Sequence, residues 1–456
     1  MAEPLPDATA ATSRVRFQVL ALIGSLSLLT YLDRICISRV QGDIQRELSL
    51  SDVEMGFVFS AFIAGYAAFL VPIGWLADLW GPKRIILSIV LWWSLFTALT
   101  GTVTNFWPGV ALWLPLPGGW MTLSWGFLAM FMTRFLFGCG EAGVYPTLAT
   151  VVRSWFPASE RAMAQGTIFM SARIGATLAP YVIGRLSHQF GWRNAFFTLG
   201  AIGVAWSVMF GLLFRNRPED HPRVSRRELE IIGPTDSPAE QAVARLPWRE
   251  LLMSPAVWLL SLAYVNIGCA WSFFPTWQPR YLLHVYEVSY ADSELWTGLP
   301  FLAGAVGSIL GGKLSDSLLR RTQNLRWSRT LVGVCGCAAA SACILAAGIV
   351  ETAPQAAVLF ALASFCNDLV LAPFWATITD LGGRFTGTLA GWFNMLACIA
   401  TALYIPAVPW LMDQGLEWRH LPLIMAGLWL IAALAWCCAD TSRTLVTVDL
   451  QSNKNA

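Results

Sequence analysis

Charged residues are scarce in this sequence. Asp, Glu, Lys and Arg make up only 13% of its 456 residues, whereas a soluble domain carries about 25%. The net charge is +2 and the cations are scattered, so the composition gives no sign of a nucleic-acid-binding surface. Hydrophobic residues make up 56% of the chain. This balance is typical of a protein embedded in a lipid bilayer.

Residues that build catalytic or metal sites are also few. The chain has four histidines, and its ten cysteines form no Cys-x-x-Cys pair and no cluster with histidine. We therefore expect the cysteines to be small packing residues, and we expect neither a metal nor a cofactor. No nucleotide-binding loop and no nucleophile–base pair stands out, which argues against an ATP-driven pump and against an enzyme.

Long apolar runs recur along most of the chain. A run of about 20 residues spans a bilayer as an α-helix, because a backbone exposed to lipid must satisfy its own hydrogen bonds. A β-barrel would show short alternating segments instead. The pattern predicts an all-α membrane protein with twelve transmembrane helices, at about residues 17–38, 53–77, 85–104, 120–150, 162–185, 194–214, 253–276, 294–314, 329–350, 354–379, 385–411 and 420–439.

A segment rich in arginine, acids and proline divides these runs into two sets of six. We predict an N-terminal half at 1–214, a linker at 215–252 and a C-terminal half at 253–456. Most of the 30 Lys and Arg residues fall in the loops on the side of the linker and the two termini. By the positive-inside rule, that side is cytoplasmic. We expect a monomer in the cell (inner) membrane.

The two halves share a short repeat. GWLADLWGPKR (74–84) follows the second run, and GGKLSDSLLRR (311–321) follows the eighth. Each has glycine, then leucine, then aspartate, then a basic pair at the same turn, which is typical of transporters built from related halves. Gly74 allows close approach of two helices, and Asp78 can accept hydrogen bonds from a helix N-terminus.

Arg134 and Glu141 lie inside the fourth apolar run. They are seven residues apart, so on a helix they share a face and lie about 10 Å apart along its axis. Charges inside a span cost several kcal/mol unless they pair or face water, which makes them functional candidates. The pair either lines a polar path through the protein or is a static ion pair that holds the fourth helix to its neighbours.

Further charges occur in three other runs. Arg173 has no acid near it in its own run, which favours an anionic partner, either a substrate carboxylate or an acid of another helix; the alternative is that its side chain reaches the membrane interface. Asp33 and Arg34 are adjacent near the outer end of the first run and point about 100° apart, and they are either functional residues or residues of the membrane interface. Asp368 in the tenth run is either a second coupling site or a packing contact, and Trp375 is a candidate aromatic wall for a sugar-like ring.

The segment 74–84 resembles the inner-turn signature of the major facilitator superfamily, with Gly74, Asp78, Gly81, Lys83 and Arg84 as its motif residues and Asp316 as the counterpart in the second half. The family usually has arginine directly after the aspartate, where this chain has Leu79. We therefore expect the charge relay of this motif to be weakened or to run through Lys83 and Arg84.

Five further stretches resemble the anion:cation symporter branch of that superfamily, which includes bacterial galactonate and hexuronate transporters and animal sialin-like transporters. These are YLDRICIS (31–38), RFLFGCGEAGVYPTLATVVRSWFPASER (134–161), GWRNAFF (191–197), FFPTWQPRYL (273–282) and LPFLAGAVGSILGGKLSD (299–316). The resemblance covers all twelve helices. It implies the major facilitator fold and a secondary active transporter of a small organic anion, such as a sugar acid.

The resemblance also implies roles for single residues. Asp33 and Glu141 match the two acids that the sugar-acid members use for protons. The predicted substrate contacts are Arg34, Tyr66, Arg134, Arg173, Trp375 and Asn394. We expect proton symport by alternating access between the two halves. The alternative is a proton-independent exchanger or uniporter of organic anions.

Overall fold

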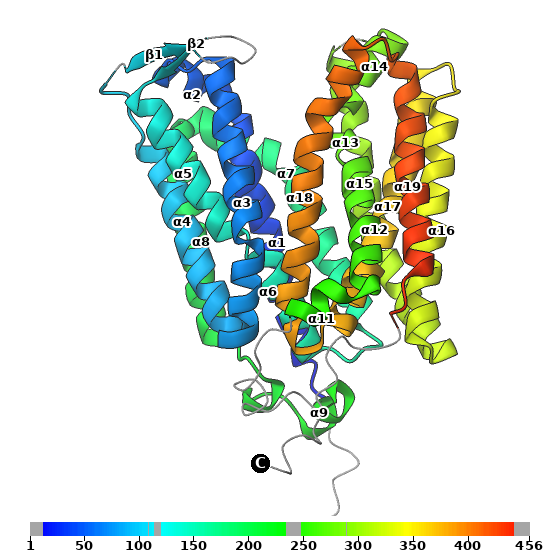
Figure 1. Cartoon of the computed structure of the whole chain (residues 1–456). Helices are drawn as coiled ribbons and strands as arrows, with labels where there is room; N and C mark the ends of the chain where they lie inside the picture. The colour runs from blue at the N-terminus through cyan, green and yellow to red at the C-terminus, as the bar shows by residue number, and fades with distance from the viewer. Residues whose placement is uncertain (1–11, 108, 114–119, 234–247, 289, 442–456) are drawn as a thin grey trace, which may run out of the picture.

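Long α-helices make up almost the whole structure, a computed structural model that describes residues 12–107, 109–113, 120–233, 248–288 and 290–441. The helices stand side by side in two groups, one formed by the first half of the chain and the other by the second half (Figure 1). We name the two ends of the bundle by what they carry. The linker end holds the segment between the groups, and the strand end holds a short β-ribbon. The expected all-α membrane fold is confirmed.

The first group contains eight helices, some of them short. They are α1 (Val15–Arg39), α2 (Gln41–Leu48), α3 (Asp52–Trp80), α4 (Pro82–Thr102), α5 (Trp125–Glu141), α6 (Val144–Trp155), α7 (Arg161–Phe190) and α8 (Trp192–Leu213). The second group is built in the same manner. Its helices are α12 (Pro255–Trp271), α13 (Phe273–Thr276), α14 (Gln278–Tyr286), α15 (Tyr290–Thr322), α16 (Leu325–Ala347), α17 (Ala353–Gly382), α18 (Thr386–Asp413) and α19 (Leu421–Cys438).

Nine segments of the described chain are long and apolar enough to cross a membrane. One of them covers residues 353–412 and contains both α17 and α18. The long helices α7 and α15 are not among the nine, and α7 carries Arg161, Arg173 and Arg185 within its length. The count of twelve spans therefore stays a prediction.

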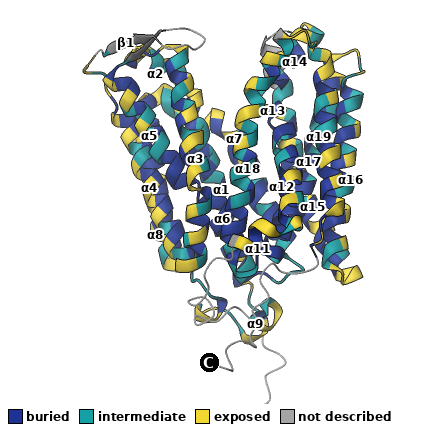
Figure 2. Cartoon of the chain, in the orientation of Figure 1, coloured by how far each residue is buried: buried dark blue, intermediate teal, exposed yellow. Residues whose placement is uncertain are grey.

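The outward faces of the helices are apolar. Exposed residues line the outside of both groups, while buried residues lie on the faces turned toward neighbouring helices (Figure 2). Leu212 and Leu434 are 71% and 67% exposed. Large apolar side chains so exposed over many helices mark a surface that meets lipid rather than water.

The fourth run differs from its predicted form at both its start and its middle. We expected a helix from residue 120, but Trp120–Leu123 forms strand β2, which pairs antiparallel with β1 (Val110–Trp113). The helix begins at Trp125, where the Ser124 hydroxyl accepts from the backbone N–H of Phe127 at 3.1 Å. It is then interrupted after Glu141, because Pro146 has no N–H to donate to the carbonyl of Ala142.

The seventh run is also interrupted, and it extends beyond the predicted end at residue 276. It consists of α12, α13 and α14 and ends at Tyr286. Pro275 and Pro279 lie in this stretch, and each removes a backbone donor from the helical ladder.

The linker is attached to the first group. It contains the 3₁₀ turn η1 (Pro218–Asp220) and the helices α9 (Arg226–Ile232) and α11 (Trp248–Met253). Glu228 of α9 is fully buried and accepts from the Ser13 hydroxyl (2.5 Å), the Val15 backbone N–H (3.1 Å) and the Arg16 guanidinium (3.1 Å). Burial alone would raise the pKa of Glu228, but these hydrogen bonds hold it below its ordinary value.

Candidate functional site

A cavity of about 360 Å³ lies between the two groups of helices. Its walls come from α1, α3, α6 and α7 of the first group and from α12, α17 and α18 of the second. Most of the wall is apolar. The aromatic side chains that line it are Tyr31, Phe62, Tyr66, Tyr145, Phe169, Tyr264, Trp271 and Trp375. A concave apolar site with a few polar groups is the usual form of a small-molecule site.

Arg34 is the more accessible of the two cations that line this cavity. Its Nε and Nη2 atoms lie 3.3 and 3.2 Å from Oε2 of Glu141, a fully buried residue of α5. The Arg34 side chain is 25% exposed. Its guanidinium carbon lies 5.0–5.2 Å from the ring centres of Tyr31, Phe62 and Tyr66. Arg34 thus joins the cavity to a buried carboxylate.

Arg134 lies away from the cavity, although it was predicted to contact substrate. It is 2% exposed, and its guanidinium carbon lies 4.2 Å from the Phe137 ring centre. It acts on Glu141 and Asp33 electrostatically, but the hydrogen-bonded partner of Glu141 is Arg34. Asp33, also buried, does not line the cavity either. We call Asp33, Arg34, Arg134 and Glu141 the four-charge cluster.

Arg173 pairs with Asp368 of the second group. Its Nε donates to Oδ2 at 2.6 Å and its Nη2 donates to Oδ1 at 2.9 Å. Both side chains are buried, and the Trp271 ring centre lies 4.3 Å from the guanidinium carbon. Gly304 makes room for the carboxylate, since a Cβ there would lie 2.4 Å from Oδ2. Of the two partners that the sequence left open for Arg173, the structure thus places the acid of another helix beside it.

The other predicted substrate contacts lie in the cavity wall. The Asn394 amide donates to the Tyr66 hydroxyl at 3.1 Å, which links α18 to α3 across the two groups. Trp375 lines the cavity but is only 1% exposed, because it packs against Tyr145 and Phe169. Its indole N–H donates to the Tyr264 hydroxyl at 3.1 Å.

Between the cavity and the linker end, Asp78 ties the two groups together. It accepts from the backbone N–H groups of Gly387 (2.8 Å) and Thr388 (2.7 Å) and from the Thr388 hydroxyl (2.7 Å). These donors form the first turn of α18, whose N-terminal dipole favours a negative charge. One turn earlier on α3, a Cβ on Gly74 would lie 2.2 Å from the carbonyl oxygen of Gly387.

The second copy of the repeat makes the matching contact in the opposite direction. Asp316 of α15 accepts from the backbone N–H groups of Ala162 (3.3 Å) and Met163 (2.7 Å) at the start of α7. A Cβ on Gly312 would lie 2.3 Å from the carbonyl oxygen of Ala162. A glycine and an aspartate four residues apart therefore dock each half onto the first turn of a helix in the other.

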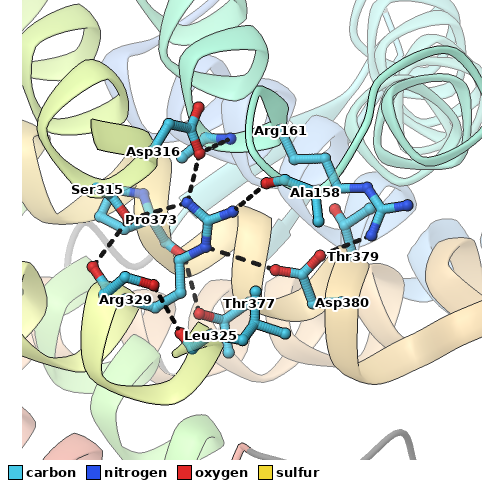
Figure 3. Close-up of polar contacts among 12 residues, drawn as sticks. Ala158, Arg161, Ser315, Asp316, Leu325, Arg329, Pro373, Thr377, Thr379 and Asp380 are labelled. Carbon is cyan, nitrogen blue, oxygen red and sulfur yellow. Dashed lines mark hydrogen bonds and ion pairs between the residues drawn. The ribbon is translucent and has the colours of Figure 1, made fainter. Parts of the chain in front are cut away.

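Arg329 completes these contacts, as Figure 3 shows. It donates to Asp316 at 2.7 Å and to the carbonyl oxygen of Ala158 at 2.7 Å, while Arg161 of α7 pairs with Asp380 of α17 at 2.7 Å. The sequence reading missed Arg329, which it took as the first residue of the ninth helix. The sequence does carry a signal for it, because Arg329 is a cation at the start of an apolar run and follows the motif residue Asp316 by 13 residues.

The remaining motif residues serve the turn after α3. Gly81 has φ +81°, a conformation that favours glycine, and the backbone N–H of Lys83 donates to Asn216 at 2.8 Å. Within the described residues, neither Lys83 nor Arg84 forms an ion pair through its side chain. The cation that acts on Asp78 is Arg153 of α6. A relay through Lys83 and Arg84 is therefore not the arrangement found, and the other expected outcome, a weakened relay, stays a prediction.

Comparison with known proteins gives consistent matches over nearly the whole chain. The sequence profile of the Major Facilitator Superfamily matches residues 23–405. The chain is 32% identical over 445 residues to the probable sulfoacetate transporter SauU of Cupriavidus necator, with 97% of each chain covered. It is 31% identical over 412 residues to the probable galactarate/D-glucarate transporter GarP of Escherichia coli K12, with 88% of each covered.

Two further matches extend this result. The hexuronate transporter of Bacillus subtilis 168 is 28% identical over 427 residues, with 93% of this chain and 94% of the relative covered. Among solved structures, the transporter FucP in its outward conformation superimposes with a TM-score of 0.65 at 16% identity, over 94% of this chain and all of that one. The structural match concerns the fold alone.

Proposed function

The chain belongs to the major facilitator superfamily, whose members are membrane transporters and not enzymes, and we propose that it moves a small organic anion across the membrane together with protons. The relatives named above transport, by their names, sulfoacetate, galactarate or glucarate, and hexuronates. They share an anionic substrate. A multi-pass transporter of an organic anion is the role that sequence and fold favour together.

The Arg34–Glu141 pair carries this proposal. Arg34 is the cation that a solute in the cavity can reach, and its planar fork suits a carboxylate or a sulfonate. An incoming anion competes with Glu141 for the same guanidinium. Substrate binding at Arg34 therefore changes the surroundings of a buried acid.

Competition for Arg34 provides a means of proton coupling. If the substrate takes the guanidinium, Glu141 keeps its place inside the bundle without its hydrogen-bonded cation. An uncompensated buried charge costs about 3–5 kcal/mol, so uptake of a proton by Glu141 accompanies substrate binding. Asp33 and Arg134 belong to the same cluster and tune this balance. The substrate and the proton then travel together.

The arrangement of contacts between the two groups supports a proposal of alternating access. The hydrogen bonds of Asp78, Asp316, Arg161 and Arg329 join the two groups between the cavity and the linker end. We propose that this is the outward-facing state of a monomer in the inner membrane, with the linker and both termini in the cytoplasm. Rocking of the two halves then opens the linker end and releases the substrate inside.

Glu141→Gln tests the coupling role. In proteoliposomes we expect this variant to lose anion uptake driven by a pH gradient and to keep counterflow exchange, because glutamine cannot bind and release the proton. The probe is whichever carboxylate gives the largest thermal stabilisation of the wild type. Glu47→Gln is the matched control, since Glu47 pairs with Arg193 outside the cavity.

Two results would count against the proposal. If Glu141→Gln keeps the pH-gradient dependence of the wild type, Glu141 is not the coupling site. If anion uptake by the wild type leaves the external pH unchanged, the exchanger or uniporter alternative is correct.

A further inference from the structure

The cavity is poor in polar groups that a bound solute could use. Several of its polar side chains already have partners within the described structure. Tyr145 bonds to Ser27 at 3.2 Å, and Ser272 donates to the carbonyl oxygen of Cys269 at 2.6 Å. Asn367 is also engaged on both sides, because it donates to Asp368 and accepts from Trp429, each at 3.0 Å.

This scarcity argues against a substrate with many hydroxyl groups. A buried hydroxyl without a partner costs about 1–3 kcal/mol, and a sugar acid brings several. Tyr31, Thr401 and the amide oxygen of Asn394 are lining groups that keep hydrogen-bonding capacity, and the hydroxyls of Tyr66 and Tyr264 each accept one bond and keep one proton to donate. A polyhydroxylated chain would leave most of its hydroxyls facing rings and aliphatic side chains.

The cavity also offers one accessible cation rather than two. Asp368 holds Arg173 through both oxygens, and the Trp271 ring covers the guanidinium, so only 6% of that side chain is exposed. Arg34 has 25% exposure. One reachable guanidinium suits a substrate with one anionic group.

Aromatic rings surround the place where that anionic group would bind. Three rings lie 5.0–5.2 Å from the guanidinium carbon of Arg34. Two other lining rings, Tyr145 and Phe169, stack at 5.5 Å between ring centres with an interplanar angle of 6°. The carbon body attached to a carboxylate on Arg34 therefore meets ring faces, which favour a flat apolar group.

We propose that the substrate is a monocarboxylate on an aromatic or similarly flat apolar body, of which benzoate is the simplest probe. This inference rests on the proposed function, since it names the substrate class of the same cavity. It separates the chain from relatives named for polyhydroxylated or doubly charged anions. The cavity volume of about 360 Å³ accommodates one substituted ring.

The test is ligand binding to the purified full-length protein in detergent, which avoids the passive leakage of weak acids through lipid. Thermal unfolding is followed with benzoate, glucarate, sulfoacetate, hexanoate, acetate or benzyl alcohol at equal concentrations. We expect benzoate to stabilise the protein, benzyl alcohol to have no effect, and glucarate to bind at least tenfold more weakly, about 1.4 kcal/mol.

The outcomes separate this inference from the function on which it rests. Tighter binding of glucarate or sulfoacetate than of benzoate overturns the aromatic class and leaves an organic-anion transporter. If no carboxylate or sulfonate stabilises the protein, and none is taken up by proteoliposomes, the transport proposal itself is wrong.

Phe62→Leu tests the ring contacts directly. The variant keeps an apolar side chain but removes one of the rings beside Arg34. We expect benzoate to bind about tenfold more weakly and hexanoate to be much less affected, with the unfolding temperature of the ligand-free protein close to the wild type. Phe197→Leu is the control, because Phe197 lies on α8 outside the cavity and is 40% exposed. Equal benzoate affinity in the two variants overturns the proposal.

Discussion

Asp78→Asn should release the contact that holds the linker end closed. Asp78 sits at the end of α3 and accepts three hydrogen bonds of 2.7–2.8 Å from Gly387 and Thr388 at the start of α18. Asparagine has the same shape but no charge, and its NH₂ group cannot accept from a backbone N–H. The substitution therefore weakens one interface between the halves without removing a side chain from the core.

The size of the effect follows from the three bonds. A hydrogen bond to a charged group contributes about 1.5–3 kcal/mol and a neutral one about 1 kcal/mol. The asparagine oxygen keeps one or two of the three as neutral bonds, so the closed linker end loses at least about 2.5 kcal/mol. At 1.4 kcal/mol per tenfold change, the ratio of closed to open linker end falls at least about 60-fold.

The native Cys398 reports this shift, because it lines the cavity on α18. In a background with the other nine cysteines replaced by alanine, a membrane-impermeant maleimide is added outside right-side-out vesicles. In the mechanism that we propose, Cys398 is open to reagent when the linker end is closed and hidden when the halves have rocked. We expect Asp78→Asn to slow labelling at least tenfold.

Two glycine variants on the same helix sharpen the test. Gly74→Ala should also slow labelling, because its Cβ would lie 2.2 Å from the carbonyl oxygen of Gly387 and force the two backbones apart. Gly56→Ala is the control, since a Cβ there meets nothing within 4 Å. Wild-type labelling rates in both Asp78→Asn and Gly74→Ala would refute the idea that this contact closes the linker end.

Two further predictions concern stability and are checked by thermal unfolding of the purified protein. Asp368→Asn leaves Arg173 buried without its counter-charge and should lower the free energy of unfolding by about 3–5 kcal/mol. The double variant Arg173→Met, Asp368→Leu should recover most of this loss. A double variant no more stable than Asp368→Asn would contradict the prediction. Burial would raise the pKa of Glu228, but hydrogen bonds from Ser13, Arg16 and Val15 lower it overall. The ionised carboxylate therefore stabilises the folded state fully above the ordinary pKa of about 4.3, and this stabilisation is lost as the pH falls through the lowered pKa. Glu228→Gln should therefore unfold at a lower temperature than the wild type near neutral pH, and the difference in unfolding temperature should shrink as the pH falls below about 4.3. An equal difference near neutral pH and in acid would be evidence against the role of Glu228.

Much of the fold could be predicted because the bilayer imposes a length and a composition on each helix. Apolar runs marked the long helices to within a few residues at most ends, and the linker stood out by its arginines and prolines. The repeat around Asp78 and Asp316 was visible in sequence for a physical reason. Each copy performs the same task, docking onto a helix N-terminus, and so needs the same residue types at the same spacing.

The partners of the buried charges could not be predicted, because helical spacing fixes only the face of a residue on its own helix. Arg134 and Glu141 do lie on one helix, but the cation that reaches the Glu141 carboxylate is Arg34, 107 residues earlier in the chain. Arg173 finds its acid 195 residues away in the other half. Such pairs depend on how helices are arranged around the cavity, which a single sequence does not record.

The helices α7 and α17 show how the halves can move against each other. Arg161 pairs with Asp380 and Arg173 pairs with Asp368, so the two pairs are twelve residues apart on each helix, about 18 Å. The two helices run in opposite directions, because the partner numbers fall from 380 to 368 as the arginine numbers rise from 161 to 173. One alignment of α7 against α17 therefore forms both pairs. Sliding by a helical turn of about 5.4 Å would break both pairs at once.

Rotation of the halves about the Arg173–Asp368 pair, beside the cavity, breaks only the Arg161–Asp380 pair near the linker end. The Arg173–Asp368 pair has 6% and 0% side-chain exposure, whereas in the other pair Arg161 is 20% exposed and the 4% exposed Asp380 has a second cation, Arg329, at 3.5 Å. Separating buried partners leaves uncompensated charges, but water can solvate a pair that already reaches the surface. The path of lower cost thus parts Arg161 from Asp380 and keeps Arg173 on Asp368. In the alternating access that we propose, opening of the linker end is then a rocking motion about a point beside the cavity, which leaves the substrate site intact while access to it changes sides.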